Sequence, residues 1–192
     1  IRSGAGDDLI HEDYGRNWID AGLGNDTIRI GAYAPTQLSD TYNQDALADT
    51  DRTTVAGRGG QDTYVIYGNG AQLIVTDFTA TGSERDRIDL SNLLTRSTGY
   101  TSGNPFGSPG YFRLRQDGQI TLLEWDRDGA SASNFTWKTQ ARLLNVTATT
   151  LTLDNFTPLA SPDGGVSGLS LTGTGGSDVF NGSLMNDTIN GL

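Results

Sequence analysis

The sequence predicts an all-β fold in which stacked coils of short strands and tight turns are covered by an antiparallel, sandwich-like region. Three observations predict it. Glycine-rich segments recur at intervals of nine residues near both ends of the 192-residue chain. The middle of the chain holds runs rich in β-branched and aromatic residues, with no convincing helix beyond a turn at 90–94. The chain has 26 glycines and no cysteine, so turns are abundant and disulfides are excluded.

The repeat is clearest at the N-terminus, where residues 3–11, 12–20 and 21–29 read SGAGDDLIH, EDYGRNWID and AGLGNDTIR. The three units share three columns. Glycine fills the fourth place of all three units, at Gly6, Gly15 and Gly24, and the second place of the first and third, at Gly4 and Gly22. The sixth place carries Asp8, Asn17 and Asp26, and the eighth carries Ile10, Ile19 and Ile28.

Further units follow. Residues 57–65 read GRGGQDTYV and contain Gly60, Asp62 and Tyr64, whereas the next nine residues keep only an apolar Leu73. A second tandem set spans 164–190; its sixth places are Leu169, Asp178 and Asp187, and its clearest glycine is Gly176. The first unit of that set has therefore lost its carboxylate.

A period of nine indicates a tight turn of about six residues followed by a strand of about three. Glycines suit the turn because several positions require positive φ or close backbone approach. The apolar eighth residue is expected to point inward. Two units then make one coil of eighteen residues, which places Asp8 and Asp26, eighteen apart, on the same side of adjacent coils.

Two carboxylates directed at one gap repel unless a cation lies between them. Oxygen-only ligands select a hard cation, and Ca²⁺ tolerates irregular coordination by carboxylates and turn carbonyls better than Mg²⁺ does. The alternative, ordinary Gly/Asp-rich surface turns without a metal, stays open. If the segment after the third unit loops out and the coil resumes at residue 57, Asp62 is expected to stack on Asn17 and form a second site there.

These units resemble G-G-x-G-x-D-x-U-x, the nonapeptide of the RTX (repeats-in-toxin, hemolysin-type) calcium-binding proteins. The resemblance implies a right-handed parallel β-roll with Ca²⁺ between stacked turns. It also implies an extracellular protein exported by type I secretion, which stays unfolded at low cytosolic Ca²⁺ and folds outside the cell. The metal site residues carried over are Gly4, Gly6, Asp8, Gly15, Asn17, Gly22, Gly24, Asp26, Gly60, Asp62, Gly176, Asp178 and Asp187.

Residues 30–56 interrupt the repeat with an Asp-rich insertion, which either adds a ligand or is solvated. Beyond it, VTDFTATGSERDRIDLSNL resembles the segment that follows the last repeats in many RTX proteins, including secreted metalloproteases and alginate epimerase modules. The runs YFRLRQDG, WDRDG and LTLDNF resemble the type I secretion target domain, with a hairpin expected at Asp117–Gly118. We expect a β-roll at 1–74, an antiparallel cap at 75–160 and the start of a second roll at 161–192.

Other functions are less well supported. A formal charge of −10 argues against nucleic acid, and no apolar run is long enough for a membrane-spanning helix. The single histidine, His11, lies outside any zinc-protease motif, and no catalytic constellation is visible, so we expect no enzyme in this segment. Asp126 and Asp128 resemble the start of a calcium loop, but a hairpin turn is favoured. Outward-facing Trp18 leaves a carbohydrate-binding or adhesin module of a larger secreted protein as the alternative.

Overall fold

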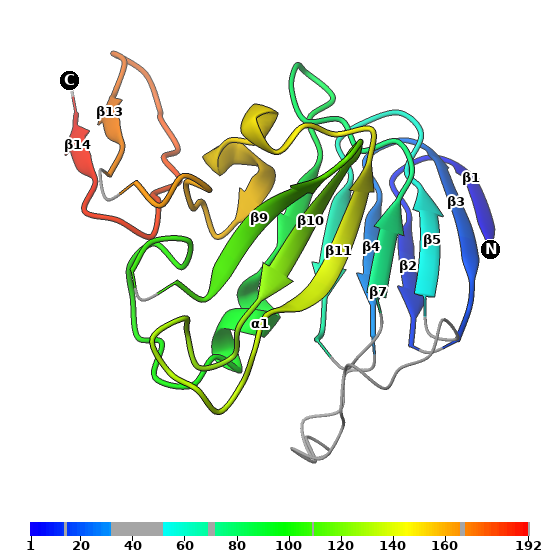
Figure 1. Cartoon of the computed structure of the whole chain (residues 1–192). Coiled ribbons are helices and arrows are strands. Elements are labelled where there is room, and N and C mark those ends of the chain that lie inside the picture. Colours follow the sequence, from blue (N-terminus) through cyan, green and yellow to red (C-terminus); the bar gives the residue numbers. More distant parts are fainter. Residues whose placement is uncertain (14, 32–51, 69–71, 109, 166–167, 192) are drawn as a thin grey trace.

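The computed structural model describes residues 1–13, 15–31, 52–68, 72–108, 110–165 and 168–191. Its main body is a parallel β-roll in which the chain alternates between two sheets (Figure 1). The first sheet contains β1 (Arg2–Ala5), β3 (Trp18–Leu23), β5 (Arg52–Ala56) and β7 (Gln72–Val75). The second contains β2 (Leu9–Glu12), β4 (Thr27–Ile30), β6 (Thr63–Ile66) and β8 (Arg87–Asp89). The predicted all-β fold with a parallel roll is confirmed.

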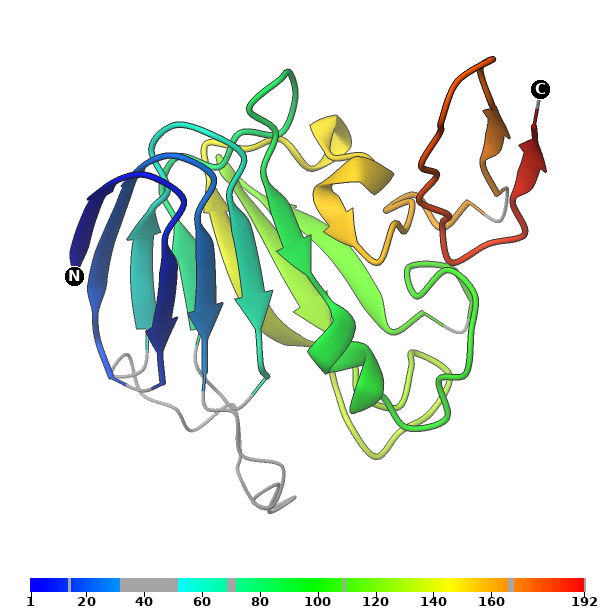
Figure 2. The same cartoon turned by 180° about the vertical axis from the view of Figure 1, so that it is seen from behind.

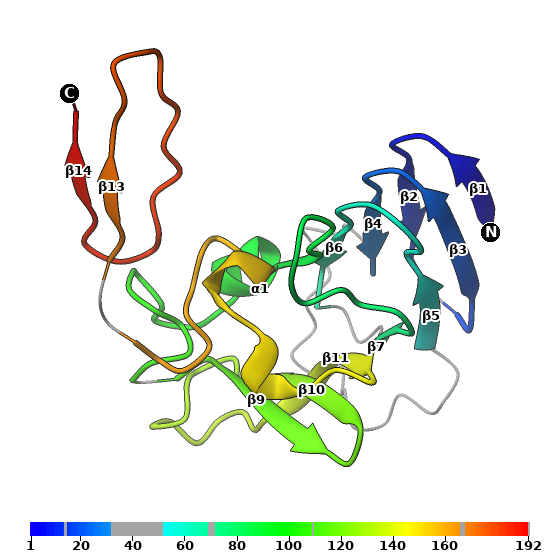
Figure 3. The same ribbon diagram turned by 90° about the horizontal axis from the view of Figure 1, so that it is seen from above.

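The register of the roll follows the repeat. Strands β2 and β4 pair with Leu9 opposite Thr27, eighteen residues later. Strands β4 and β6 pair with Thr27 opposite Thr63, thirty-six residues later, because a longer segment lies between them. Most of the predicted insertion, residues 32–51 with its aspartates, lies outside the described residues, and its last five residues form β5. Viewed from above, the two sheets of the roll face each other (Figure 3).

The eighth-place side chains form the core between the two sheets, as predicted. Ile19, Ile28, Tyr64 and Leu73 are fully buried and belong to one hydrophobic cluster. Burying an Ile or Leu side chain stabilises a fold by roughly 1.5–3 kcal/mol. The stacked apolar column is therefore a main source of stability for the roll.

Glycines in the turns are required by close approach of successive coils. Gly22 has φ +103°, and a Cβ atom there would lie 1.7 Å from the carbonyl oxygen of Gly4. Gly24 and Gly60 repeat this relation against the carbonyls of Gly6 and Gly24, at 2.3 and 2.1 Å. The glycine columns thus let turn backbones stack directly on one another.

The antiparallel part continues the first sheet of the roll. Strands β9 (Phe112–Asp117) and β10 (Ile120–Trp125) form the expected hairpin, with Gly118 at φ +59° in its turn. Strand β11 (Lys138–Leu144) pairs antiparallel with β10 and parallel with β7, so the order is β1-β3-β5-β7-β11-β10-β9. The pairing covers the edge of β7, which would otherwise expose unpaired backbone groups.

The second sheet ends in a similar way. Its order is β12-β8-β6-β4-β2, in which β12 (Phe156–Thr157) pairs parallel with β8. Along the chain, the segment between β8 and β12 holds, besides β9 to β11, a short helix α1 (Ser91–Thr95) and two 3₁₀ turns, Ala148–Thr150 and Leu153–Asn155. The boundary expected after residue 74 falls within β7, and both sheets continue beyond it. The expected division into three units stays a prediction.

The C-terminal segment forms a separate small element. Strands β13 (Ser170–Thr172) and β14 (Thr188–Asn190) pair in parallel, eighteen residues apart, as the repeat requires. Figures 1 and 2 show this pair at the opposite side of the molecule from β1. A backbone hydrogen bond from Leu184 to Leu159 connects it to the main body.

Candidate metal centre

Four aspartates stack along one end of the roll, each directly before a strand of the second sheet. The backbone N–H of Asp8 donates to Asp26 Oδ1, that of Asp26 to Asp62 Oδ1, and that of Asp62 to Asp86 Oδ1, each at 2.9 Å. We call Asp8, Asp26, Asp62 and Asp86 the aspartate column. Successive coils therefore bring a carboxylate next to the turn of the coil before it.

The stacking of Asp8 on Asp26 was expected, but the expected stacking of Asp62 on Asn17 is wrong. Residues 52–56 form β5 and supply the half coil that precedes Asp62, so Asp62 follows Asp26 in the column. Asn17 lies at the other end of the roll, where its amide donates to Glu12 Oε1 at 2.6 Å. Gly15, beside it, also belongs to that opposite end.

Three of the four side chains in the aspartate column are buried, and Asp8 is half-buried. Asp26, Asp62 and Asp86 are 1, 2 and 3% exposed, and the Oδ2 atoms of Asp8 and Asp26 are buried without a hydrogen-bond partner among the described residues. A carboxylate oxygen buried without a partner is costly. These two atoms therefore fit a cation between the first coils of the roll.

Burial and mutual repulsion perturb the titration of the column. Burial raises the pKa of Asp62 to about 6, and neighbouring carboxylates such as Asp26 add to that effect while a backbone hydrogen bond opposes it. Burial also raises the pKa of Asp86 to about 7 and that of Asp26 above its ordinary value. Burial therefore makes ionisation of these carboxyls unfavourable, and a bound cation would offset that cost.

A second row of side chains runs beside the column. Asp7 Oδ1 accepts a hydrogen bond from the Asn25 backbone at 2.7 Å, and Asn25 Oδ1 accepts one from the Gln61 backbone at 2.8 Å. The carbonyl groups of Gly4, Gly6 and Gly24 stack in the same turns. Carboxylate, amide and main-chain oxygens are therefore concentrated at this end of the roll.

The donor set is suited to a hard cation. Among the described residues, no three His, Cys, Asp or Glu side chains gather as a ready-made metal cluster. A cation between turns would therefore take its remaining ligands from main-chain carbonyls, as Ca²⁺ commonly does.

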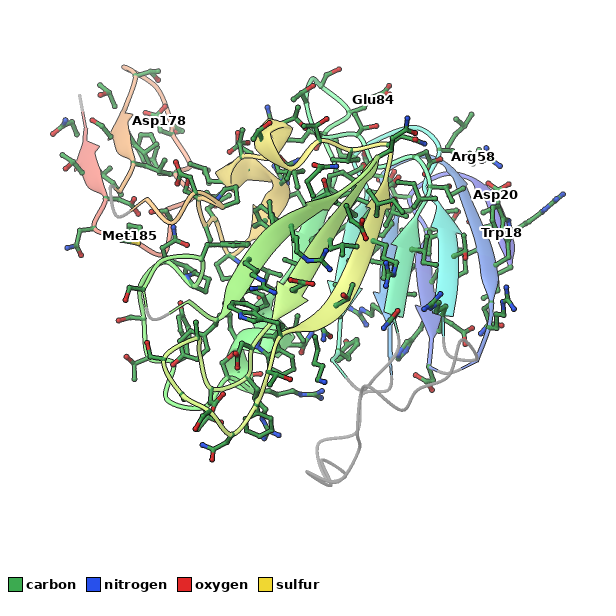
Figure 4. All side chains as sticks on the ribbon, in the orientation of Figure 1. Trp18, Asp20, Arg58, Glu84, Asp178 and Met185 are labelled. Atoms are coloured by element: carbon green, nitrogen blue, oxygen red, sulfur yellow. The ribbon has the colours of Figure 1, made fainter. Side chains whose placement is uncertain are left out.

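The C-terminal aspartates are organised differently. Asp187 Oδ1 accepts a hydrogen bond from the Leu169 backbone at 2.6 Å, eighteen residues earlier, which repeats the geometry of the column. Asp178 accepts hydrogen bonds from the backbone and hydroxyl of Thr174, at 2.8 and 3.0 Å. Gly176 lies in the same turn, where its backbone N–H donates to the Thr174 hydroxyl. The structure keeps this group apart from the column (Figure 4 labels Asp178).

Sequence reasoning missed two acidic residues at the roll site. Asp86 continues the column, and its signal is the D-x-U ending Asp86-Arg87-Ile88, which lacks the preceding glycines. Asp77 accepts hydrogen bonds from the backbones of Gly57 and Arg58, at 3.0 and 3.1 Å. Asp77 had no repeat signal, because it belongs to the longer turn between β7 and β8.

Comparisons with known proteins give a likeness of fold. No family model matches the chain, and no curated protein matches it. A solved structure of the R2 subunit of AlgE6, a mannuronan C5-epimerase from Azotobacter vinelandii, is 20% identical with a TM-score of 0.44 and covers 84% of this chain and 93% of that one. The R3 subunit of the same epimerase is 22% identical with a TM-score of 0.38, over 79% and 78% of the two chains.

The described residues contain no helix long and apolar enough to cross a membrane.

Proposed function

We propose that this chain is a calcium-binding RTX module of a larger secreted protein, and that Ca²⁺ binding along the aspartate column folds the roll outside the cell. The observation that carries the proposal is the stack of buried carboxylates with two unpartnered oxygens, on Asp8 and Asp26. The nonapeptide repeat supports it, because its glycines let the backbones of successive turns approach closely at this end of the roll. Export by type I secretion and a supporting role beside a separate catalytic domain belong to the same proposal.

Each part of the site has a distinct role in this proposal. Asp8, Asp26 and Asp62 would hold cations between adjacent turns, and the glycines would let turn carbonyls approach. When bound, Ca²⁺ supplies positive charge that offsets carboxylate repulsion. A site at a hundredfold excess of ligand stabilises the folded state by about 2.7 kcal/mol, so two or three sites match a typical domain stability of about 5–15 kcal/mol.

Circular dichroism tests the proposal. In chelator the chain should give a largely unfolded spectrum, and millimolar Ca²⁺ should restore the strand signal. Millimolar Mg²⁺ is the matched control and should not substitute, because Mg²⁺ demands compact octahedral coordination. Identical spectra in chelator and Ca²⁺, or equal folding by Mg²⁺, would contradict the proposal.

One observation favours polysaccharide binding as a second candidate function. Trp18 is 51% exposed on the outer face of β3, as predicted. Asp20, two residues along the same strand, forms a bidentate pair with Arg58 at 2.9 Å (Figure 4). An exposed aromatic ring beside fixed polar groups offers the apolar face and hydrogen bonds that a sugar requires.

Titration of the Ca²⁺-loaded chain with a panel of neutral and acidic polysaccharides tests this second function. Trp18→Ala should abolish any binding, whereas Leu23→Ala, an exposed apolar residue at the end of the same strand, should retain it. Binding that survives Trp18→Ala, or no binding to any of the polysaccharides, would remove this candidate.

A further inference from the structure

A second pair of aspartates lies far from the roll turns, in the loop that joins β10 to β11. Asp126 directly follows β10, and Asp128 precedes Gly129, whose φ is +79°. The loop is anchored at its base: the Asp126 backbone donates to the Tyr111 carbonyl at 2.9 Å, and the Ala130 backbone donates to the Gly110 carbonyl at 2.9 Å. The two carboxylates are therefore held in a fixed place.

Both carboxylates have an oxygen without a partner. Asp126 is 4% exposed, and its Oδ1 is buried with no hydrogen-bond partner among the described residues. The Oδ1 of Asp128 is buried in the same way, while its Oδ2 accepts a hydrogen bond from the Asn134 backbone at 3.0 Å. Only four carboxylate oxygens of the described chain are in this condition, and the other two belong to the aspartate column.

The two groups lie within hydrogen-bonding reach of each other and perturb each other's charge. Burial raises the pKa of Asp126, and contact with Asp128 adds to that effect. Burial opposes ionisation of Asp128 as well, but hydrogen bonds from Asn134 and Asp126 lower its pKa. One positive charge between them would relieve this repulsion.

The nearby arginines are already engaged elsewhere. Arg113 donates to Glu124 Oε2 at 2.6 Å and stacks over the ring of Trp137 at 4.3 Å. Arg127, between the two aspartates in sequence, donates to the Arg96 carbonyl at 3.2 Å and lies over the ring of Phe135. Neither Asp126 nor Asp128 forms an ion pair with a described residue.

We propose that Asp126 and Asp128 form a divalent cation site, separate from the roll, that binds Ca²⁺. Its protein ligands are the two Oδ1 atoms. Asn134, whose backbone N–H donates to Asp128, is exposed, and water entering from that side would complete the coordination. An irregular loop with oxygen ligands suits Ca²⁺, which accepts varied geometry. The turn favoured by the sequence at Asp126 and Asp128 is present as well: the Gly129 backbone donates to the Asp126 carbonyl at 3.3 Å, at the start of the loop that joins antiparallel β10 and β11.

Equilibrium dialysis of the full chain against Ca²⁺ tests the site by counting bound ions. Asp128→Asn should bind one ion fewer than the unmodified chain. Asp62→Asn, in the aspartate column, is the matched control, because it should weaken roll binding and leave the loop ion in place. Asp128 is chosen because it is less buried than Asp126, and circular dichroism in Ca²⁺ should show that the variant keeps its strand content.

Terbium luminescence gives an independent measurement. Tb³⁺ replaces Ca²⁺ and emits when a nearby tryptophan is excited, and Trp125 is adjacent to Asp126. Tryptophan-sensitised emission should fall several-fold in Asp128→Asn but remain in Trp18→Phe, which removes the tryptophan of the roll. An unchanged ion count together with unchanged emission in Asp128→Asn would overturn the proposal and leave a proton shared by the two carboxyls. If the unmodified chain binds the loop ion but no ion in the roll, the proposed function is contradicted and this site is not.

Discussion

The N-terminal roll and the C-terminal β13–β14 segment carry the same repeat but differ in what it achieves. In both, a backbone N–H at the sixth place donates to a carboxylate eighteen residues later, as Asp8 does to Asp26 and Leu169 to Asp187. The roll stacks four strands in each sheet and buries its apolar column. The C-terminal segment has one strand pair, and its Ile189 is 55% exposed.

The same difference appears in the carboxylates. Burial raises the pKa of Asp62, whereas hydrogen bonds from Ser183 and Leu169 lower the pKa of Asp187. A nonapeptide therefore fixes local geometry, and the number of stacked coils decides whether its carboxylate is desolvated. Since desolvation creates the need for a cation, we expect Ca²⁺ to matter most in the roll.

The largest contrast is expected from the turn glycines. Gly22→Ala places a Cβ against the Gly4 carbonyl and requires a strained φ, so it should destabilise the chain in Ca²⁺ by about 3 kcal/mol or more. Gly176→Ala meets its nearest atom, the Thr174 hydroxyl oxygen, at 3.7 Å, so its effect should stay below about 0.5 kcal/mol. Urea unfolding in excess Ca²⁺ measures both, and equal losses would show that coil stacking does not distinguish the two regions.

Aspartate replacement should show a similar but smaller contrast. Asp62→Ala removes a buried member of the aspartate column and should cost about 2–3 kcal/mol in excess Ca²⁺, the contribution of one well-occupied site. Asp178→Ala, in the exposed C-terminal turn, should change the free energy of unfolding by less than about 0.5 kcal/mol. Urea unfolding in excess Ca²⁺ measures both variants, and a larger effect of Asp178→Ala than of Asp62→Ala would reverse the comparison.

A double-mutant cycle sharpens the comparison within the roll. Asp26 and Asp62 are neighbours in one column, so Asp26→Ala and Asp62→Ala should couple by about 0.5–3 kcal/mol. Asp62→Ala and Asp187→Ala lie in separate elements and should add within about 0.5 kcal/mol. Additive costs for Asp26 and Asp62 would place them in independent sites.

The metal-free chain should respond to pH through the column. Burial raises the pKa of Asp62 to about 6 and that of Asp86 to about 7 in the folded state, above the unfolded value of about 4, so folding takes up protons. Their contribution to stability is therefore complete below about pH 4 and is lost as the pH rises through those two values. In chelator, the strand signal in circular dichroism should grow as the pH falls from about 8 to about 5, and saturating Ca²⁺ should remove this dependence. A strand signal that weakens in chelator as the pH falls from about 8 to about 5 would contradict this prediction.

The repeat makes the roll largely predictable from sequence, because residue type and spacing act locally. Ile19 and Ile28 were expected to point inward, and both are buried. The partner of Asp62 was not predictable, since it depends on whether β5 completes a coil, and 52–56 lacks the glycine turn that marks the other units. Asp86 was missed because its unit also lacks the glycines that precede the other aspartates.

The burial of side chains was a second property that could not be predicted from the sequence. Asp126 and Asp128 stood out by spacing alone, and spacing carries no information about their desolvation. That depends on how the loop after β10 packs against Tyr111 and Gly110, which are close in space through the β9–β10 pairing. Properties that depend on long-range packing were thus beyond sequence reasoning, whereas the periodic elements were not.

Hydrogen–deuterium exchange tests the central claim, that the buried column and not the repeat as such makes folding depend on calcium. Backbone amides of β2, β4 and β6 should exchange slowly in millimolar Ca²⁺ and rapidly in chelator. Amides of β13 and β14 should exchange rapidly in both conditions, because that strand pair is exposed. Equal protection of β2, β4 and β6 with and without Ca²⁺ would contradict the account.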